Sequence, residues 1–198
     1  FLDSASLELF QELARIRQFV RETTGMSMPE RIIKMREAGY SIPGNEAEFL
    51  KMRGEAQHQA IIDRGLSNPE YLTPGTMELL QALKTDPGRK LAILSGGGTA
   101  RRRSYAETLG ISPFFNENDI RGGGRKAQQF GELLKEWGLE PRQAVIIGDG
   151  NVEMQVAKDA GALAVGFALT SQDRKRLIDA GADVIINRDF TDVSAILR

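Results

Sequence analysis

Cysteine is absent from this chain of 198 residues. Without cysteine there can be no disulfide bond and no thiolate metal site, and a reducing compartment fits, so we expect a cytoplasmic protein. Long apolar runs are also lacking: none reaches the roughly 18 residues of a membrane span, and no signal-peptide pattern is visible among the first residues. We therefore expect no membrane partner.

The chain also lacks an excess of charge of either sign. Its 26 basic and 27 acidic residues leave a formal net charge of −1. Because a phosphate backbone requires a basic face, nucleic acid is not expected as the main partner. The tightest basic cluster, Arg101–Arg103, is too short to change this. With 198 residues, 41% of them hydrophobic, the chain suits one soluble domain or a core domain with a small appendage.

The hydrophobic pattern divides the chain into two parts. Residues 4–72 predict helices and no strand: apolar residues recur at helical spacing before residue 21, a second helix is expected from Pro29 to Ala38, and a third begins near Asn45. From residue 73, helices alternate with short apolar runs. The runs that predict strands are 90–94, 144–148, 162–167 and 183–186. This alternation indicates an α/β fold, a parallel sheet with helices on both faces.

Polar residues follow the ends of these predicted strands. Ser95 and the glycines 96–98 end the first run, Asp149 follows Gly148 at the end of the second, and Lys126 opens a helix after three glycines. In open α/β sheets, ligands bind outside the carboxyl ends of the strands. Backbone N–H groups at a helix start and a lysine bind phosphate, and carboxylates bind Mg²⁺. The set predicts a site for a phosphate and a divalent cation.

Each of these residues also has a plainer interpretation. Ser95 could cap the next helix, the glycines could form a flexible turn, and Lys126 could be solvated. Asp149 and Glu153 could complement a helix dipole. The plainer interpretation is preferred outright for three other features: Gly122–Gly124 as a loop, His58 as a surface or packing residue, and Trp137 as a core residue.

With these residues in place, the sequence resembles the haloacid dehalogenase-like superfamily, and within it the phosphoglycolate-phosphatase-like members, over nearly the whole chain. "KLAILSGG" resembles the second motif, which implies that Ser95, with Gly96 and Gly97, binds the transferring phosphoryl group. "GGRKAQQF" resembles the third motif and implies that Lys126 steadies negative charge. "AVIIGDGNVEM" resembles the fourth motif, with Asp149 and Glu153 as Mg²⁺ ligands. The resemblance implies a Rossmann-like core over 73–198 and a helical cap over 4–72.

Two departures from the family pattern stand out. The second acid of the fourth motif is usually aspartate, whereas this chain has Glu153, whose longer side chain can still hold a metal through water. The first motif, an apolar strand followed by two aspartates, is missing. "LDS" at 2–4 resembles its tail, but Asp3 is no substitute for the nucleophile, because no strand precedes it.

In the family's sheet order, the missing strand lies between the Ser95 strand and the Asp149 strand. Its absence would leave a slot of roughly 10 Å and buried unpaired backbone groups that cost about 1–3 kcal/mol each, against a typical stability of about 5–15 kcal/mol. No apolar run is left over to fill it. We therefore expect that the nucleophile strand lies upstream of Phe1 or comes from another segment; the alternative is a true loss of the nucleophile.

The resemblance implies a Mg²⁺-dependent phosphatase that hydrolyses a small phosphorylated metabolite through an aspartyl-phosphate. One alternative is a non-catalytic domain of the same fold that binds a phosphate ligand or a partner protein. Another is a nucleotide-binding module, disfavoured because "SGGGT" lacks the G-x-G-x-x-G spacing. Mutase or dehalogenase chemistry, the substrate and the oligomeric state stay open. Five basic cap residues could meet an anionic substrate, although a solvated face is favoured for most of them: Arg31, Lys34, Arg36, Lys51 and Arg53.

Overall fold

The computed structural model describes residues 72–191 without interruption. Before that range it describes residues 11, 14–16, 18–19, 22–23, 26, 28–42, 44–45, 48–49, 52, 55–56 and 59. Asp3, Lys51, Arg53 and His58 lie outside the described residues, and so does most of the first predicted helix.

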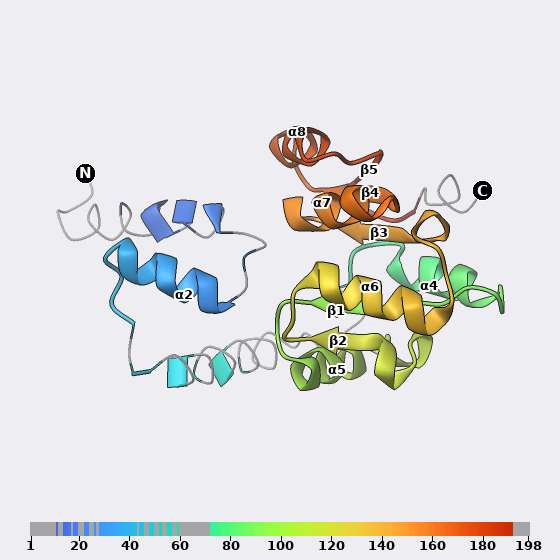
Figure 1. Ribbon diagram of the computed structural model, residues 1–198, viewed down its shortest axis with the longest axis horizontal. Helices are drawn as coiled ribbons and strands as arrows, with labels where there is room; N and C mark the ends of the chain where they lie inside the picture. The colour runs from blue at the N-terminus through green and yellow to red at the C-terminus, as the bar shows by residue number, and fades with distance from the viewer. Residues whose placement is uncertain are drawn as a thin grey trace.

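The described strands form two parallel sheets. In the first, β1 (Ile93–Ser95) pairs with β2 (Ile120–Gly122). In the second, β4 (Leu163–Ala168) lies between β3 (Val145–Gly148) and β5 (Val184–Asn187). Figure 1 shows the strands in the order β2, β1, β3, β4, β5 across the molecule. The predicted α/β class is confirmed, and every predicted strand forms, although β1 is shorter than the apolar run that indicated it.

Strand β2 was not predicted. Gly122, which was expected to lie in a loop at 122–124, is instead a strand residue. This glycine ends β2 and pairs with Ser95. Its N–H donates to Thr99 Oγ1 at 2.9 Å, and Thr99 Oγ1 donates to its carbonyl at 3.1 Å. A three-residue strand with Ile120 as its sole apolar residue has no periodicity to detect. Pairing with β1 and the Thr99 side chain, both distant in sequence, create the strand.

Five helices cover the strands, as the alternation predicts. Their ends agree with the glycine signals: Gly138 and Gly161 adopt left-handed φ values of 66° and 82° as C-terminal caps. Three short 3₁₀ helices connect elements at Ser112–Phe114, Glu117–Asp119 and Pro141–Gln143. The helices are α4 (Thr76–Lys84), α5 (Thr99–Thr108), α6 (Lys126–Trp137), α7 (Asn151–Ala160) and α8 (Ser171–Asp179).

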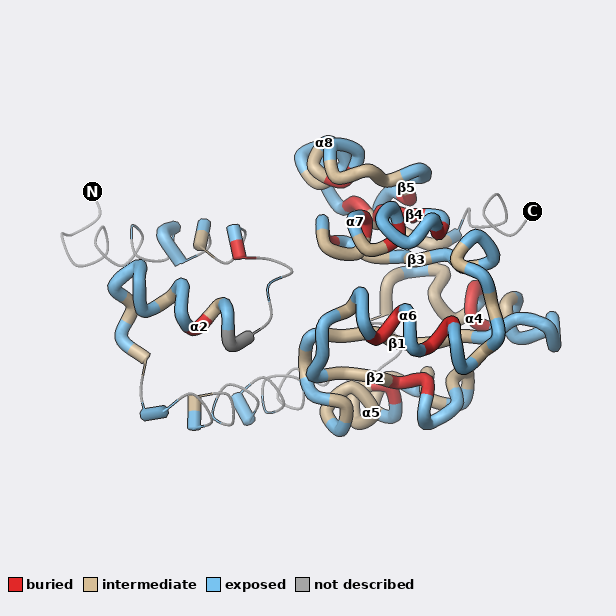
Figure 2. Tube along the Cα trace, viewed as in Figure 1, coloured by how far each residue is buried: buried red, intermediate tan, exposed pale blue. Residues whose placement is uncertain are grey.

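The core lies on both faces of β4. Successive side chains of a strand point to opposite faces, and Ala164 packs with α6, α7 and α8 whereas Val165 packs with Leu79 of α4. Figure 2 shows the buried residues concentrated in these layers. Leu94 of β1 and Ile146 of β3 pack against the same buried cluster. One hydrophobic core therefore supports both sheets and sets the positions of their ends.

The described residues before 72 are helical or irregular, as predicted. Helix α2 (Met28–Glu37) buries Ile32 completely, and Figure 1 shows this helix to one side of the sheets. Asn45 and Glu48 form the expected reciprocal capping pair, with N–H to side-chain distances of 2.9 and 3.0 Å. None of the helices within the described ranges is long and apolar enough to cross a bilayer.

Candidate active site

Ser95 stands at the tip of β1, where the glycine loop 96–98 begins. Its Oγ accepts a hydrogen bond from the backbone N–H of Gly97 at 3.2 Å. The N-terminal cap of α5 is Gly98, three residues further on, so the alternative in which Ser95 caps this helix is wrong. The loop ends at Thr99, whose hydroxyl forms hydrogen bonds with both the N–H and the carbonyl of Gly122. The loop is thereby held against β2, and it is not a free turn.

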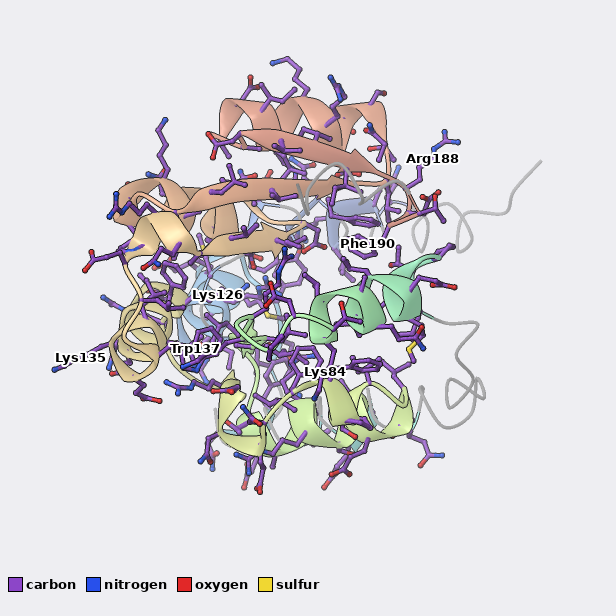
Figure 3. All side chains as sticks on the ribbon, turned by 90° about the vertical axis from the view of Figure 1, so that its right-hand side faces the viewer. Lys84, Lys126, Lys135, Trp137, Arg188 and Phe190 are labelled. Atoms are coloured by element: carbon purple, nitrogen blue, oxygen red, sulfur yellow. The ribbon has the colours of Figure 1, made fainter. Side chains whose placement is uncertain are left out.

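Lys126 is the first residue of α6, and its side chain points into the molecule. Figure 3 shows it in the interior of the view, whereas Lys135 of the same helix projects outward. Lys126 Nζ forms an ion pair with Glu153 Oε1, and their side chains are only 22% and 13% exposed. Burial lowers the pKa of Lys126, an effect that the charge of Asp149 opposes and that of Arg102 reinforces. The solvated-helix interpretation of Lys126 is therefore wrong.

Glu153 reaches Lys126 by folding over the loop after β3. A Cβ on Gly148 would lie 2.5 Å from Glu153 Cγ, and one on Gly150 would lie 2.4 Å from its Oε2. The two glycines thus leave the space that the glutamate side chain occupies. Asp149, between them, follows the end of β3 and is exposed. The loop therefore carries an exposed carboxylate, Asp149, and the buried carboxylate of Glu153 from the first turn of α7 packs against the glycines on either side of it.

These two carboxylates could hold a divalent cation. Glu153 Oε2 is buried and has no hydrogen-bond partner in the structure, which leaves one oxygen for a ligand beside the exposed Asp149. Over the described ranges there is no group of three or more His, Cys, Asp or Glu side chains that could bind a metal. A pair suffices for Mg²⁺, which keeps several waters and often uses one or two protein carboxylates. The donor set fits this ion.

Two arginines near the site were missed at the level of sequence. Arg176 of α8 donates to the backbone carbonyl of Asp149 at 2.9 Å and to Asn151 Oδ1 at 2.8 Å, which ties the β3 loop to α8. Arg102 of α5 lies against Gly97, where a Cβ would be 2.7 Å from its Nη2. Its position one turn into the helix that follows the glycine loop was an available signal. For Arg176, 25 residues from Asn151, there was none.

Trp137 is only partly the core residue that its helical position predicts. It lies at the end of α6, half-buried, while Leu133 and Leu134 fill the interior. Its indole N–H donates to the buried Asp119 at 3.2 Å, and Lys90 Nζ lies 5.8 Å from the ring centre. Trp137 therefore closes the edge of the core and takes no part in the site.

Sequence comparisons match most of this chain to known proteins. A sequence model of the haloacid dehalogenase-like hydrolase family matches residues 10–161. Among curated proteins, the chain is similar to a phosphoserine phosphatase of Archaeoglobus fulgidus, 33% identical over 141 residues, which are 64% of this chain and 39% of that protein. It is also similar to a phosphoserine phosphatase of Idiomarina loihiensis, 30% identical over 62% of this chain and 59% of that protein. The chain thus spans well under two thirds of these relatives.

Solved structures share the fold. A haloacid dehalogenase-like family protein of Streptococcus pneumoniae superposes with a TM-score of 0.68 at 22% identity, over 91% of this chain and 80% of that one. A predicted phosphoglycolate phosphatase of Haemophilus somnus superposes with a TM-score of 0.62 at 23% identity, over 85% and 75%. The family match covers more than half of the residues, and it agrees with the resemblance seen in the motifs. This chain belongs to the haloacid dehalogenase-like hydrolases.

Proposed function

We propose that this chain forms the site of a phosphatase that hydrolyses a phosphoric monoester of a small metabolite. One observation carries the proposal: Lys126, from a helix start, pairs with Glu153 and feels the charges of Asp149 and of Arg102, and Arg102 lies against Gly97 in the loop after Ser95. A hydroxyl, an ammonium and carboxylates at strand ends suit a phosphoryl group with a metal. The curated relatives, which are phosphoserine phosphatases, support the same reaction class.

Each residue has a defined part in this proposal. Ser95 Oγ and the N–H groups of Gly96 and Gly97 bind the phosphoryl oxygens, and Lys126 neutralises their charge. Asp149 and Glu153 are the residues that would hold Mg²⁺, which when bound stabilises negative charge on the phosphoryl group. Because Glu153 also pairs with Lys126, it sets the position of the ammonium relative to the metal ligands.

The nucleophile belongs, in our proposal, to a further strand between β1 and β3. Across the described part of the chain, β1 pairs with β2 and β3 pairs with β4, and no strand pairs with their other edges. Figure 1 shows β1 and β3 as neighbours in the strand order. Val145 and Ile147 of β3 are 47% and 39% exposed, unusual for a strand of a parallel sheet. A strand inserted here would bring an aspartate between Ser95 and Asp149.

Residues 4–72 act as a helical cap in this proposal, closing over the substrate and excluding bulk water. Contacts join α2 to the segments around it: Arg15 Nη2 donates to Ala38 O at 2.6 Å, and the rings of Phe19 and Tyr40 lie 5.1 Å apart between centres. Two of the cap cations are engaged within the cap. Arg31 donates to Thr23 O at 2.6 Å, and Lys34 pairs with Glu37.

The test is turnover of p-nitrophenyl phosphate and of O-phosphoserine, with and without Mg²⁺. We expect Asp149→Asn to abolish Mg²⁺-dependent turnover while circular dichroism stays unchanged. Asp159→Asn is the matched control: it removes the same charge from the exposed end of α7, where Asp159 accepts from Gln155 at 2.6 Å, and it should retain activity. Full turnover in Asp149→Asn would refute the metal site.

The same reaction, quenched in acid and digested, locates the covalent intermediate. The proposal expects the phosphoryl group on an aspartate of the inserted strand. A phosphoryl group on Asp149, or on another aspartate within residues 72–191, would contradict the strand assignment. A folded protein with no turnover and no phosphoryl adduct would favour the non-catalytic alternative, a domain that binds a phosphate ligand or a partner.

A further inference from the structure

Arg102 combines burial with an unmatched charge beside the glycine loop. It lies on the second turn of α5 and is half-buried. Its Nε is buried and has no hydrogen-bond partner. Burial lowers the pKa of Arg102, an effect that Tyr105 opposes and that the charge of Arg101 reinforces. Of the described side chains, no carboxylate pairs with this guanidinium, whose recorded neighbour is the ring of Tyr105, 5.5 Å from Cζ. A desolvated cation without an anion is costly.

The guanidinium of Arg102 lies against the glycine loop 96–98. It occupies the space over Gly97, where a Cβ would lie 2.7 Å from Nη2 and 3.3 Å from Cζ. Gly97 in turn donates its N–H to Ser95 Oγ. A glycine at 97 therefore allows the arginine to lie flat on the loop, next to the hydroxyl proposed to bind the phosphoryl group.

The charges around the loop are unbalanced as they stand. Arg102 is close enough to Lys126 for its charge to lower the pKa of Lys126 further. Glu153 offsets part of the charge of Lys126 through its ion pair, whereas Arg102 has no carboxylate partner among the described side chains and adds a second cation for an incoming anion. Like charges held together repel each other, and a dianionic group bound between them removes that cost. A guanidinium also offers a fork of N–H donors that matches phosphate oxygens.

We propose that Arg102 is a further phosphoryl-binding residue, which holds the phosphate dianion against the glycine loop together with Ser95 and Lys126. This inference rests on the proposed phosphatase site and adds to it a cation that the motifs do not contain. Because Glu153 offsets part of the charge of Lys126, Arg102 supplies the additional charge that favours a phosphate dianion over a neutral group.

The test is calorimetric titration of the purified protein with inorganic phosphate in the presence of Mg²⁺. We expect Arg102→Gln to weaken phosphate affinity about ten- to hundredfold, the range for lost hydrogen bonds to a charged group. Arg102→Lys keeps the charge and loses the fork, so it should fall between Arg102→Gln and the unmodified protein. The control is Arg103→Gln, on the same helix, because Arg103 donates to the carboxylate and carbonyl of Glu117; its phosphate affinity should be unchanged.

The outcomes separate this inference from the proposed function. If the unmodified protein binds no phosphate, the proposed site itself is wrong and the inference falls with it. If the unmodified protein binds phosphate and Arg102→Gln binds it equally well, the inference alone is wrong. Should Arg102→Gln fail to fold, Arg102→Lys decides the matter, since an affinity equal to that of the unmodified protein would overturn the predicted role of the fork. The same titration with O-phosphoserine gives a further check: if Arg102→Gln binds inorganic phosphate normally and loses affinity only for O-phosphoserine, Arg102 contacts the carboxylate and the phosphoryl role is overturned.

Discussion

Replacing Gly122 by alanine is expected to displace the glycine loop 96–98 and to destabilise the protein. The Cβ of alanine would lie 1.9 Å from the carbonyl oxygen of Gly97, and 2.8 Å from Gly98 C and from Thr99 N. Ordinary contact begins at 3.4 Å, so the closest atom must retreat by 3.4 − 1.9, about 1.5 Å. All three obstacles are backbone atoms, so no rotamer change relieves the clash.

The magnitude follows from the cost of overpacking. Inserting a methyl group into a packed site costs about 1–3 kcal/mol, which for a chain of this size corresponds to a melting temperature lower by about 2–12 °C. The conformation of Gly122 adds nothing, because its φ is not left-handed. Activity should suffer more than stability, since a misplacement of about 1 Å among catalytic groups costs on the order of 100-fold in rate.

The assay pairs thermal unfolding with phosphatase turnover. Gly98→Ala is the matched control for stability: it lies in the same loop, its φ is −59°, and nothing stands within 4 Å of its Cβ. It should cost less than about 1 kcal/mol, the loss of a glycine N-cap. If Gly122→Ala melts at the same temperature as Gly98→Ala and keeps full turnover, the close packing of β2 on the loop is not what positions the site.

Two further predictions concern buried and capping acids. Asp119→Ala leaves the indole N–H of Trp137 and the amide of Asn116 without their acceptor, so urea unfolding followed by the fluorescence of this single tryptophan should show a loss of about 1–3 kcal/mol; an unchanged midpoint would contradict the buried hydrogen bonds. Thr170 is the N-terminal cap of α8, and its hydroxyl donates to Asp173 Oδ2 at 2.7 Å, a hydrogen bond that lowers the pKa of Asp173. A carboxylate whose pKa is lowered by folding stabilises the protein above its unfolded-state pKa of about 3.9, and this contribution is lost as the pH falls through the lower folded-state pKa. The melting-temperature difference between Asp173→Ala and the unmodified protein should therefore be largest at neutral pH and shrink as acid protonates Asp173; a difference independent of pH would refute the charged cap.

The sequence determined the class of the fold and the places of the chemical groups along the chain. A short apolar run between turn signals, such as 162–167, predicts a strand of a parallel sheet, and glycines such as Gly138 and Gly161 end helices because glycine enters the left-handed region without strain. Because the carboxyl ends of parallel strands lie at one edge of a sheet, the sequence alone predicts that Ser95, Lys126 and Asp149 lie near one another.

Tertiary structure alone decided which groups meet. Gly122 becomes a strand residue because β1 and Thr99 lie beside it, and its own neighbours carry no strand pattern. Glu153 pairs with Lys126, 27 positions away, and Arg102 turns toward Gly97 because of the face that α5 presents. The local pattern of apolar residues indicates which side of a segment is buried, and so which secondary structure it forms. The partner of a polar side chain depends instead on how whole elements pack together, and no short stretch of sequence specifies that packing.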